Sequence, residues 1–154
     1  MRRRDFVKTT AVWAMTWPLA ARAQQAPGIR RIGVLMGTAA DDTESRAELT
    51  AFRDSLAKLG WVEGNTIHID YRYPDNPDQY PRLAKELIAL HPEVIFAQST
   101  PAAAVLQRET RTTPIVFVNV SDPIGSGFVS SLARPGGNLT GVIAYEPDRC
   151  QQAV

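Results

Sequence analysis

The sequence has 154 residues, of which 44% are hydrophobic and 21% are charged. This composition is typical of a globular protein and excludes a collagen-like chain, a wholly disordered chain and a membrane protein with several spans. The length suits one domain with one hydrophobic core. A single cysteine, Cys150, excludes an intrachain disulfide and any site that needs several cysteines.

Residues 1–23 have the three parts of an export signal. A cationic start is followed by an apolar run from Ala11 to Ala21 and by the small-residue cleavage site Ala21-Arg22-Ala23. The run is shorter than the roughly 20 residues that span a bilayer. The string Arg3-Arg4-Asp5-Phe6-Val7-Lys8 matches the twin-arginine pattern. We therefore expect a twin-arginine-type signal peptide, cleaved after Ala23, and a periplasmic location. A basic N-terminal arm or an interfacial helix is the alternative.

The formal net charge of +1 is the sum of two parts of the chain with opposite charge. Residues 1–23 carry five of the 17 basic residues and one of the 16 acidic residues, so the remainder is mildly acidic. An acidic surface lacks the basic footprint with which proteins bind nucleic acid. We therefore expect no nucleic-acid partner.

After a Gln-, Ala- and Pro-containing linker at residues 24–29, the sequence alternates between strand and helix patterns. Strands are predicted over residues 31–36, 66–71, 94–97, 115–119 and 139–144. Most of these are continuous apolar runs, which are typical of strands buried on both faces of a parallel sheet. Helices are predicted between them over residues 41–59, 78–90, 100–110 and 122–132.

Each predicted helix begins at a residue whose side chain can accept a backbone N–H. The expected N-caps are Asp41, Asp78, Thr100 and Asp122. In the first helix, three- and four-residue spacing gives an apolar stripe made of Leu49, Phe52, Leu56 and Leu59. Five strands alternating with four helices predict an α/β fold with a doubly wound parallel sheet, helices on both faces, and the flavodoxin-like (Rossmann-like) strand order 2-1-3-4-5. We assign residues 30–144 to this lobe and 145–154 to a tail.

Open parallel sheets bind ligands beyond the carboxyl ends of their strands. The loops expected there supply the candidate ligand-binding residues Gly37, Thr38, Ser99, Thr100, Asn119 and Asp122. Ser99 and Thr100 combine two hydroxyls with a helix N-terminus, which suits a carboxylate or another small anion. Asp122 suits a ligand ammonium. The alternative is that Ser99, Thr100 and Asp122 only cap helices and that Asn119 only forms a turn.

The sequence gives little support for catalysis. Gly33-x-x-x-Gly37 after the first strand lacks the dinucleotide spacing, no P-loop string is present, and Gln98 stands where a phospho-receiver domain needs a carboxylate. Of the two histidines, His68 is expected at a solvent-facing strand position and His91 at the end of a helix. We expect no catalytic residues, no metal site and no cofactor. A small exported hydrolase is the weakest alternative, because no nucleophile–base pair is recognisable.

Trp61, Tyr71 and Tyr73 are expected to pack beside the first helix and the second strand. The alternative is that these aromatic rings stack on a ligand.

Several strings of the sequence together resemble one family. They are MRRRDF at the start, WPLAARAQQ at 17–25, AFR at 51–53, LGWVEGN at 59–65, YRY at 71–73, TPAAA at 100–104, PIVFV at 114–118, DP at 122–123 and SLARPGGNLTGV at 131–142. The sequence is similar, from residue 1 to about residue 143, to the periplasmic substrate-binding proteins of ABC transporters. The string RPGGN-x-TG is the most specific, since no general structural rule requires it.

This resemblance implies a type I binding-protein fold, in which two Rossmann-like lobes enclose a cleft, with the N-terminal lobe alone present here. It implies ligand contacts at Ser99, Thr100 and Asp122, and also at Gly37 and Thr38. It further implies a small organic solute, such as an amino acid, that is delivered to an ABC permease. An exported sensing or interaction domain of the same fold, without a transport role, is the alternative.

The sequence departs from the family after the fifth strand. Residues 145–154 do not continue with the expected helix, and no second lobe follows. We therefore expect a truncated, frameshifted or fragmentary gene product that binds its solute more weakly than two lobes would. We also expect marginal stability or self-association, because the fifth strand forms an open sheet edge.

Overall fold

The computed structural model describes residues 28–143. The predicted signal peptide, most of the predicted linker, the predicted tail and Cys150 lie outside these residues. No helix within residues 28–143 combines the length and the apolar character that a membrane span needs.

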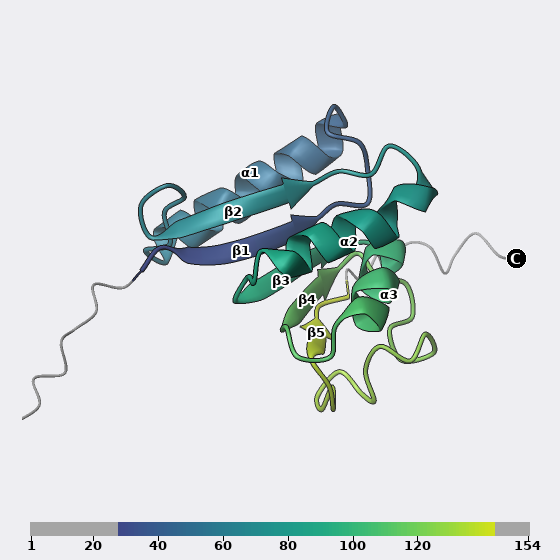
Figure 1. The fold of residues 1–154 in the computed structure, drawn as a ribbon. Helices are drawn as coiled ribbons and strands as arrows, with labels where there is room; N and C mark the ends of the chain where they lie inside the picture. The colour runs from purple at the N-terminus through teal and green to yellow at the C-terminus, as the bar shows by residue number, and fades with distance from the viewer. Residues whose placement is uncertain (1–27, 144–154) are drawn as a thin grey trace, which may run out of the picture.

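Five parallel strands form one sheet in the order β2-β1-β3-β4-β5, as predicted (Figure 1). The strands are β1 (Arg30–Leu35), β2 (Ile67–Arg72), β3 (Val94–Gln98), β4 (Ile115–Val118) and β5 (Leu139–Gly141). Every neighbouring pair is parallel, so all five carboxyl ends lie at one edge of the sheet. We call this edge the carboxyl edge. The last strand ends three residues before the predicted limit of residue 144.

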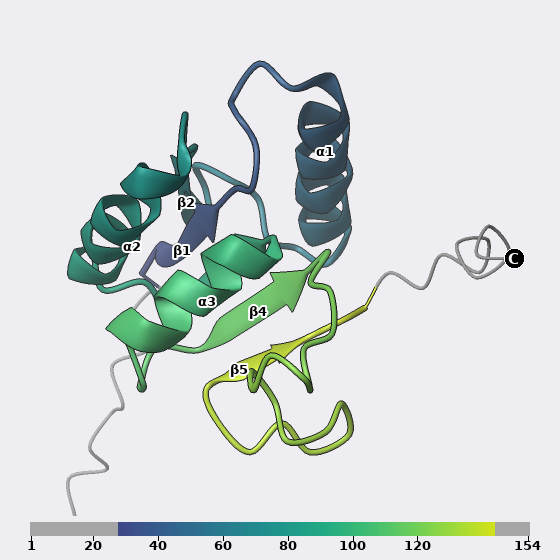
Figure 2. The same cartoon turned by 90° about the vertical axis from the view of Figure 1, so that its right-hand side faces the viewer.

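Helices cover both faces of the sheet (Figure 2). The α-helices are α1 (Thr43–Lys58), α2 (Tyr80–Ala89) and α3 (Thr100–Glu109). Helices α2 and α3 pack together on one face, which we call the α2/α3 face, and α1 lies on the other, the α1 face. The predicted doubly wound arrangement is therefore confirmed.

Two predicted N-caps are wrong by one residue. The cap of α1 is Asp42 rather than Asp41, and its Oδ1 accepts the backbone N–H of Ser45 at 2.8 Å. The cap of α3 is Ser99 rather than Thr100. In both places two adjacent side chains are suited to capping. The residue that caps is the one at which the chain leaves the extended strand or loop conformation.

The second helix also begins differently from the prediction. A short 3₁₀ helix, η1 (Pro77–Gln79), precedes α2, and its N-cap is Asn76 rather than Asp78. The Asn76 side chain accepts the backbone N–H of Asp78 at 3.2 Å. The 3₁₀ turn leads directly into α2, which has no side-chain cap of its own.

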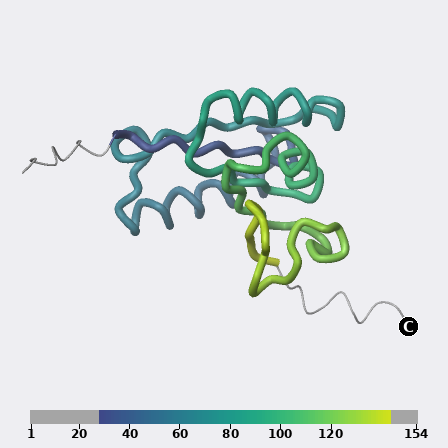
Figure 3. Tube along the Cα trace, turned by 60° about the horizontal axis from the view of Figure 1, so that its bottom comes forward, coloured from purple at the N-terminus to yellow at the C-terminus, as the bar shows by residue number. Residues whose placement is uncertain are grey.

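The predicted helix over residues 122–132 does not form. Asp122 has φ 43°, a left-handed conformation that cannot begin an α-helix, and its Oδ1 accepts the N–H of Gly125 at 2.8 Å in a tight turn. The backbone O of Pro123 accepts the N–H of Phe128 at 2.9 Å. The segment between β4 and β5 is therefore an irregular loop that folds back beside β5 (Figure 3).

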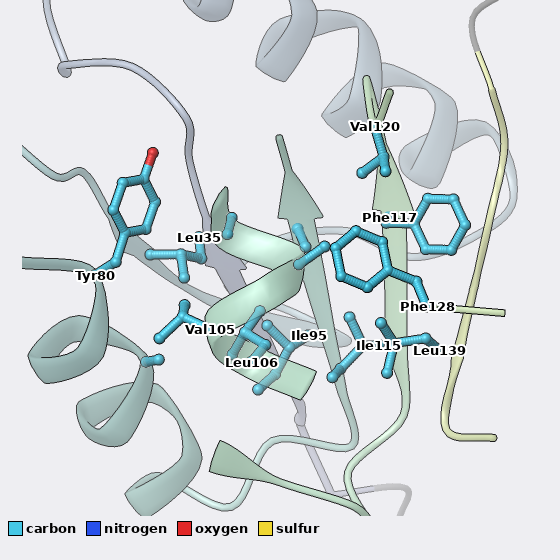
Figure 4. Close-up of a cluster of buried hydrophobic side chains, with 14 of the residues drawn as sticks. Leu35, Tyr80, Ile95, Val105, Leu106, Ile115, Phe117, Val120, Phe128 and Leu139 are labelled. Carbon is cyan, nitrogen blue, oxygen red and sulfur yellow. The ribbon is translucent and has the colours of Figure 1, made fainter. Parts of the chain in front are cut away.

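The α2/α3 face holds the larger core (Figure 4). Strand residues Ile95, Ile115 and Phe117 are fully buried there against Val105 and Leu106 of α3. The irregular loop contributes Val120, Phe128 and Val129 to the same cluster. Burial of these side chains holds the loop in place without a helix.

The α1 face holds a smaller core of Val34, Met36, Leu49, Ile67 and Ile69. The predicted stripe of α1 ends early, because Leu59 is 74% exposed. Trp61, Tyr71 and Tyr73 pack against this cluster, as the packing interpretation predicts.

Candidate functional site

The loops that follow β1, β3 and β4 meet at the carboxyl edge (Figure 1). The hydrogen bonds between them show how closely they are joined. Gly37, after β1, donates its backbone N–H to Oε1 of Gln98 at 2.9 Å. A Cβ built on Gly37 would lie 2.5 Å from the backbone O of Gln98, so only glycine allows this approach.

Thr38 is tied to the first turn of α1. Its Oγ1 shares a hydrogen bond with Oγ of Ser45, which is buried. The backbone N–H of Ser45 holds the carboxylate of Asp42, and this hydrogen bond lowers the pKa of Asp42 below its ordinary value. Gly37 and Thr38 are therefore held in place by hydrogen bonds to Gln98 and Ser45.

Ser99 and Thr100 lie where β3 passes into α3. The Oγ of Ser99 accepts the N–H of Ala102 at 3.3 Å, so Ser99 caps α3. The Oγ1 of Thr100 accepts the backbone N–H of Ser121 at 3.1 Å, which joins this turn to the loop after β4. Both hydroxyls act as acceptors within the protein, so each retains its O–H as a donor for a ligand.

Asn119 and Asp122 lie in the loop after β4, and both have left-handed backbones, with φ of 53° and 43°. Asn119 Nδ2 donates to Glu48 Oε1 at 3.2 Å. One oxygen of Asp122 closes the turn to Gly125, and both Asn119 and Asp122 are exposed. The helix-capping alternative for Asp122 is therefore wrong, because no helix follows it and its side chain closes a turn instead. Asn119 has the backbone conformation of a turn residue, as its alternative predicts. A ligand-binding role for either residue stays a prediction.

Two residues of this region were not predicted as site residues. Gln98, the last residue of β3, is only 9% exposed and donates from Nε2 to Glu48 Oε2 at 3.0 Å. Glu48 comes from the middle of α1. The position of Gln98 at the end of a buried strand is a signal that sequence reasoning could have used. Glu48 gives no such signal, because it lies within a helix and far along the chain from its partners.

The carboxyl edge therefore brings together groups of opposite kinds. The N-terminus of α3 and the hydroxyls of Ser99 and Thr100 suit a negative group. The carboxylates of Glu48 and Asp122 suit a positive group. Such an arrangement can hold a small zwitterion.

Comparison with known proteins identifies the class of protein. The family model described as "ABC transporter substrate binding protein" matches residues 31–153. The match covers most of the chain, so the protein belongs to this family.

A curated relative is the "Tyrosine-binding protein" of Clostridioides difficile (strain R20291), which is 33% identical over 95 residues. That alignment covers 61% of this chain and 28% of the relative, so the chain spans less than a third of the length of that relative.

Three solved structures are similar to this chain in fold, and the chain again covers only part of each. A ligand-free, open substrate-binding protein with adhesive properties from Clostridium difficile has a TM-score of 0.66 and 30% identity, over 73% of this chain and 38% of that one. An ABC domain in complex with L-Trp from Streptococcus pneumonia has a TM-score of 0.69 and 28% identity, over 75% and 38%. A conserved domain protein from Vibrio cholerae has a TM-score of 0.70 and 30% identity, over 77% and 40%.

Proposed function

We propose that this protein is the solute-binding component of an ABC importer and that its solute is an amino acid. Membership of the substrate-binding family supports a small-molecule ligand. A relative described as tyrosine-binding and a structural neighbour that holds L-Trp support an amino acid, and favour an aromatic one. The observation that carries the proposal is the pairing of anion-binding and cation-binding groups at one edge of the sheet.

In the proposed complex, the solute carboxylate lies at the N-terminus of α3 and accepts hydrogen bonds from the hydroxyls of Ser99 and Thr100. The solute ammonium lies beside Asp122 and Asn119. Gly37 and Thr38 lie beside the solute on the side of α1. This assignment gives each of the six predicted residues a role.

The location and partners belong to the same proposal. The twin-arginine pattern of residues 3–8 supports export, and the family supports delivery to an ABC permease. We also propose that the chain self-associates, since β5 pairs only with β4 among the described residues and leaves its other edge open.

The proposal is tested by NMR titration of the chain with the twenty common amino acids, which also detects weak binding. We expect at least one amino acid to move backbone signals at Ser99 and Thr100. Asp122→Asn keeps the turn to Gly125 but removes the charge, so it is expected to weaken binding at least about ten-fold, the effect of losing one charge-assisted hydrogen bond.

The matched control is Asp54→Asn, which removes one charge from an exposed position on α1 away from the carboxyl edge. It is expected to leave the affinity unchanged. Binding of no amino acid would contradict the proposed function, and equal weakening by the two variants would contradict the role of Asp122.

A further inference from the structure

Glu48 joins the ends of two strands to α1. Its Oε2 accepts the side-chain N–H of Gln98 at 3.0 Å, and its Oε1 accepts that of Asn119 at 3.2 Å. Gln98 in turn accepts the backbone N–H of Gly37 at 2.9 Å. One carboxylate thus connects the loops after β1, β3 and β4, which are the three loops of the proposed solute site.

The chemistry of these partners fixes the orientation of the Gln98 amide. Its two neighbours are the N–H of Gly37, which can only donate, and an ionised carboxylate, which can only accept. Rotating the amide by 180° would face N–H against N–H and oxygen against oxygen. A buried amide between two such neighbours has a single satisfied orientation.

The same carboxylate forms a hydrogen bond with only one end of the Asn119 amide. Glu48 accepts the hydrogen bond that Nδ2 of Asn119 donates. Among the described residues, no hydrogen bond reaches Oδ1 of Asn119. Oδ1 is therefore the acceptor that this amide presents away from Glu48, at the carboxyl edge.

Glu48 is exposed, and its two side-chain partners are both neutral amides. Within residues 28–143, no Lys, Arg or His forms an ion pair with Glu48 or with Asp122. Two carboxylates without cationic partners make this edge favourable for a positive group and unfavourable for a second negative one.

We propose that Glu48 is a positioning residue of the solute site: it holds the Asn119 amide so that Oδ1 accepts a hydrogen bond from the solute ammonium, and it thereby selects solutes that carry an amine. This inference rests on the proposed function. It assigns to α1 a part in solute recognition.

The first arm of the test needs no solute. Side-chain amide signals of Gln98 and Asn119 are recorded by ¹⁵N NMR in the wild-type chain and in Glu48→Gln, Glu48→Asp and Glu48→Ala. Glu48→Gln offers only one acceptor to two donors, so we expect both amide signals to shift, and Glu48→Ala to shift them further. Glu48→Asp retains the carboxylate, so we expect its amide signals to lie closer to the wild-type positions than those of Glu48→Gln.

The second arm measures selectivity with L-tyrosine, one of the amino acids in the panel above, and with its deaminated counterpart 3-(4-hydroxyphenyl)propanoate. We expect the wild-type chain to prefer L-tyrosine at least about ten-fold, and Glu48→Gln to lose most of this preference. Glu44→Gln is the matched control, because Glu44 lies one turn earlier on the same helix. It is expected to change neither the amide signals nor the preference.

The outcomes separate the two proposals. Unchanged Gln98 and Asn119 signals in Glu48→Gln would overturn the positioning role, whatever the protein binds. An unchanged preference in Glu48→Gln would overturn the selectivity. If no amino acid binds the wild-type chain, the proposed function fails and the recognition role of Glu48 fails with it, even where the amide signals move.

Discussion

The two faces of the sheet are covered to different extents. On the α2/α3 face, two helices and the irregular loop bury the side chains of β3, β4 and β5, and Phe117 is 0% exposed. On the α1 face, a single helix covers β1, β2 and part of β3. Val118 of β4 is only half-buried there, and Val142, just after β5, is 64% exposed.

A groove marks the boundary of the covered part of the α1 face. It has a volume of about 470 Å³, and its apolar lining includes Phe52, Phe96, Val118 and Val142. Phe52 and Phe96, both in this lining, stack with ring centroids 4.8 Å apart. Parallel strands are normally covered on both faces. Stability and shape therefore rest mainly on the α2/α3 face, while the α1 face supplies Glu48 to the carboxyl edge.

The largest expected effect tests this asymmetry directly. Phe117→Ala empties a fully buried position of β4 and is expected to lower the free energy of unfolding by about 3–5 kcal/mol. Phe96→Ala removes a half-buried ring on the α1 face and is expected to lower it by only about 1–2 kcal/mol. Urea unfolding measures both, and equal losses would show that the two faces contribute alike.

A second test adds an atom instead of removing several. A Cβ on Gly141 would lie 2.1 Å from the backbone O of Phe117, on the face where no space remains. Gly141→Ala is therefore expected to cost about 1–3 kcal/mol of unfolding free energy. Its neighbour Thr140 points to the α1 face and is exposed, so Thr140→Val is the control and is expected to stay within about 0.5 kcal/mol. A tolerated Gly141→Ala would contradict the tight packing of β5 on β4.

The smallest expected effect concerns the cap of α1. The N–H of Ser45 lowers the pKa of Asp42, so the Asp42 carboxylate stabilises the fold above the ordinary Asp pKa of about 4, and this contribution is lost as the pH falls through the lowered value. Asn also caps helices but does not titrate.

Asp42→Asn is therefore expected to lose less stability than the wild-type chain between neutral pH and pH 3, as measured by urea unfolding at each pH. Asp41→Asn is the matched control, since Asp41 does not cap α1, and it should retain the wild-type pH dependence. An identical acid loss in Asp42→Asn would show that the carboxylate does not support the only helix on the α1 face of the described residues.

The sequence by itself determined the sheet and its order. Apolar runs and helical stripes are local patterns, and right-handed crossovers leave few ways to connect five parallel strands. The same rules placed the candidate site at the carboxyl edge, where Thr100 accepts the N–H of Ser121 and Asn119 donates to Glu48. The ligand-binding roles of the candidate residues stay predictions.

Only the tertiary structure decided the features that depend on contacts between distant segments. The loop after Asp122 is irregular because its turn and the burial of Phe128 and Val129 replace a helix. Glu48 reaches the candidate site because folding brings α1 beside Gln98 and Asn119, which lie 50 and 71 residues further along the chain. A local pattern fixes which side chains a strand or helix buries, but packing fixes which polar groups meet at its end.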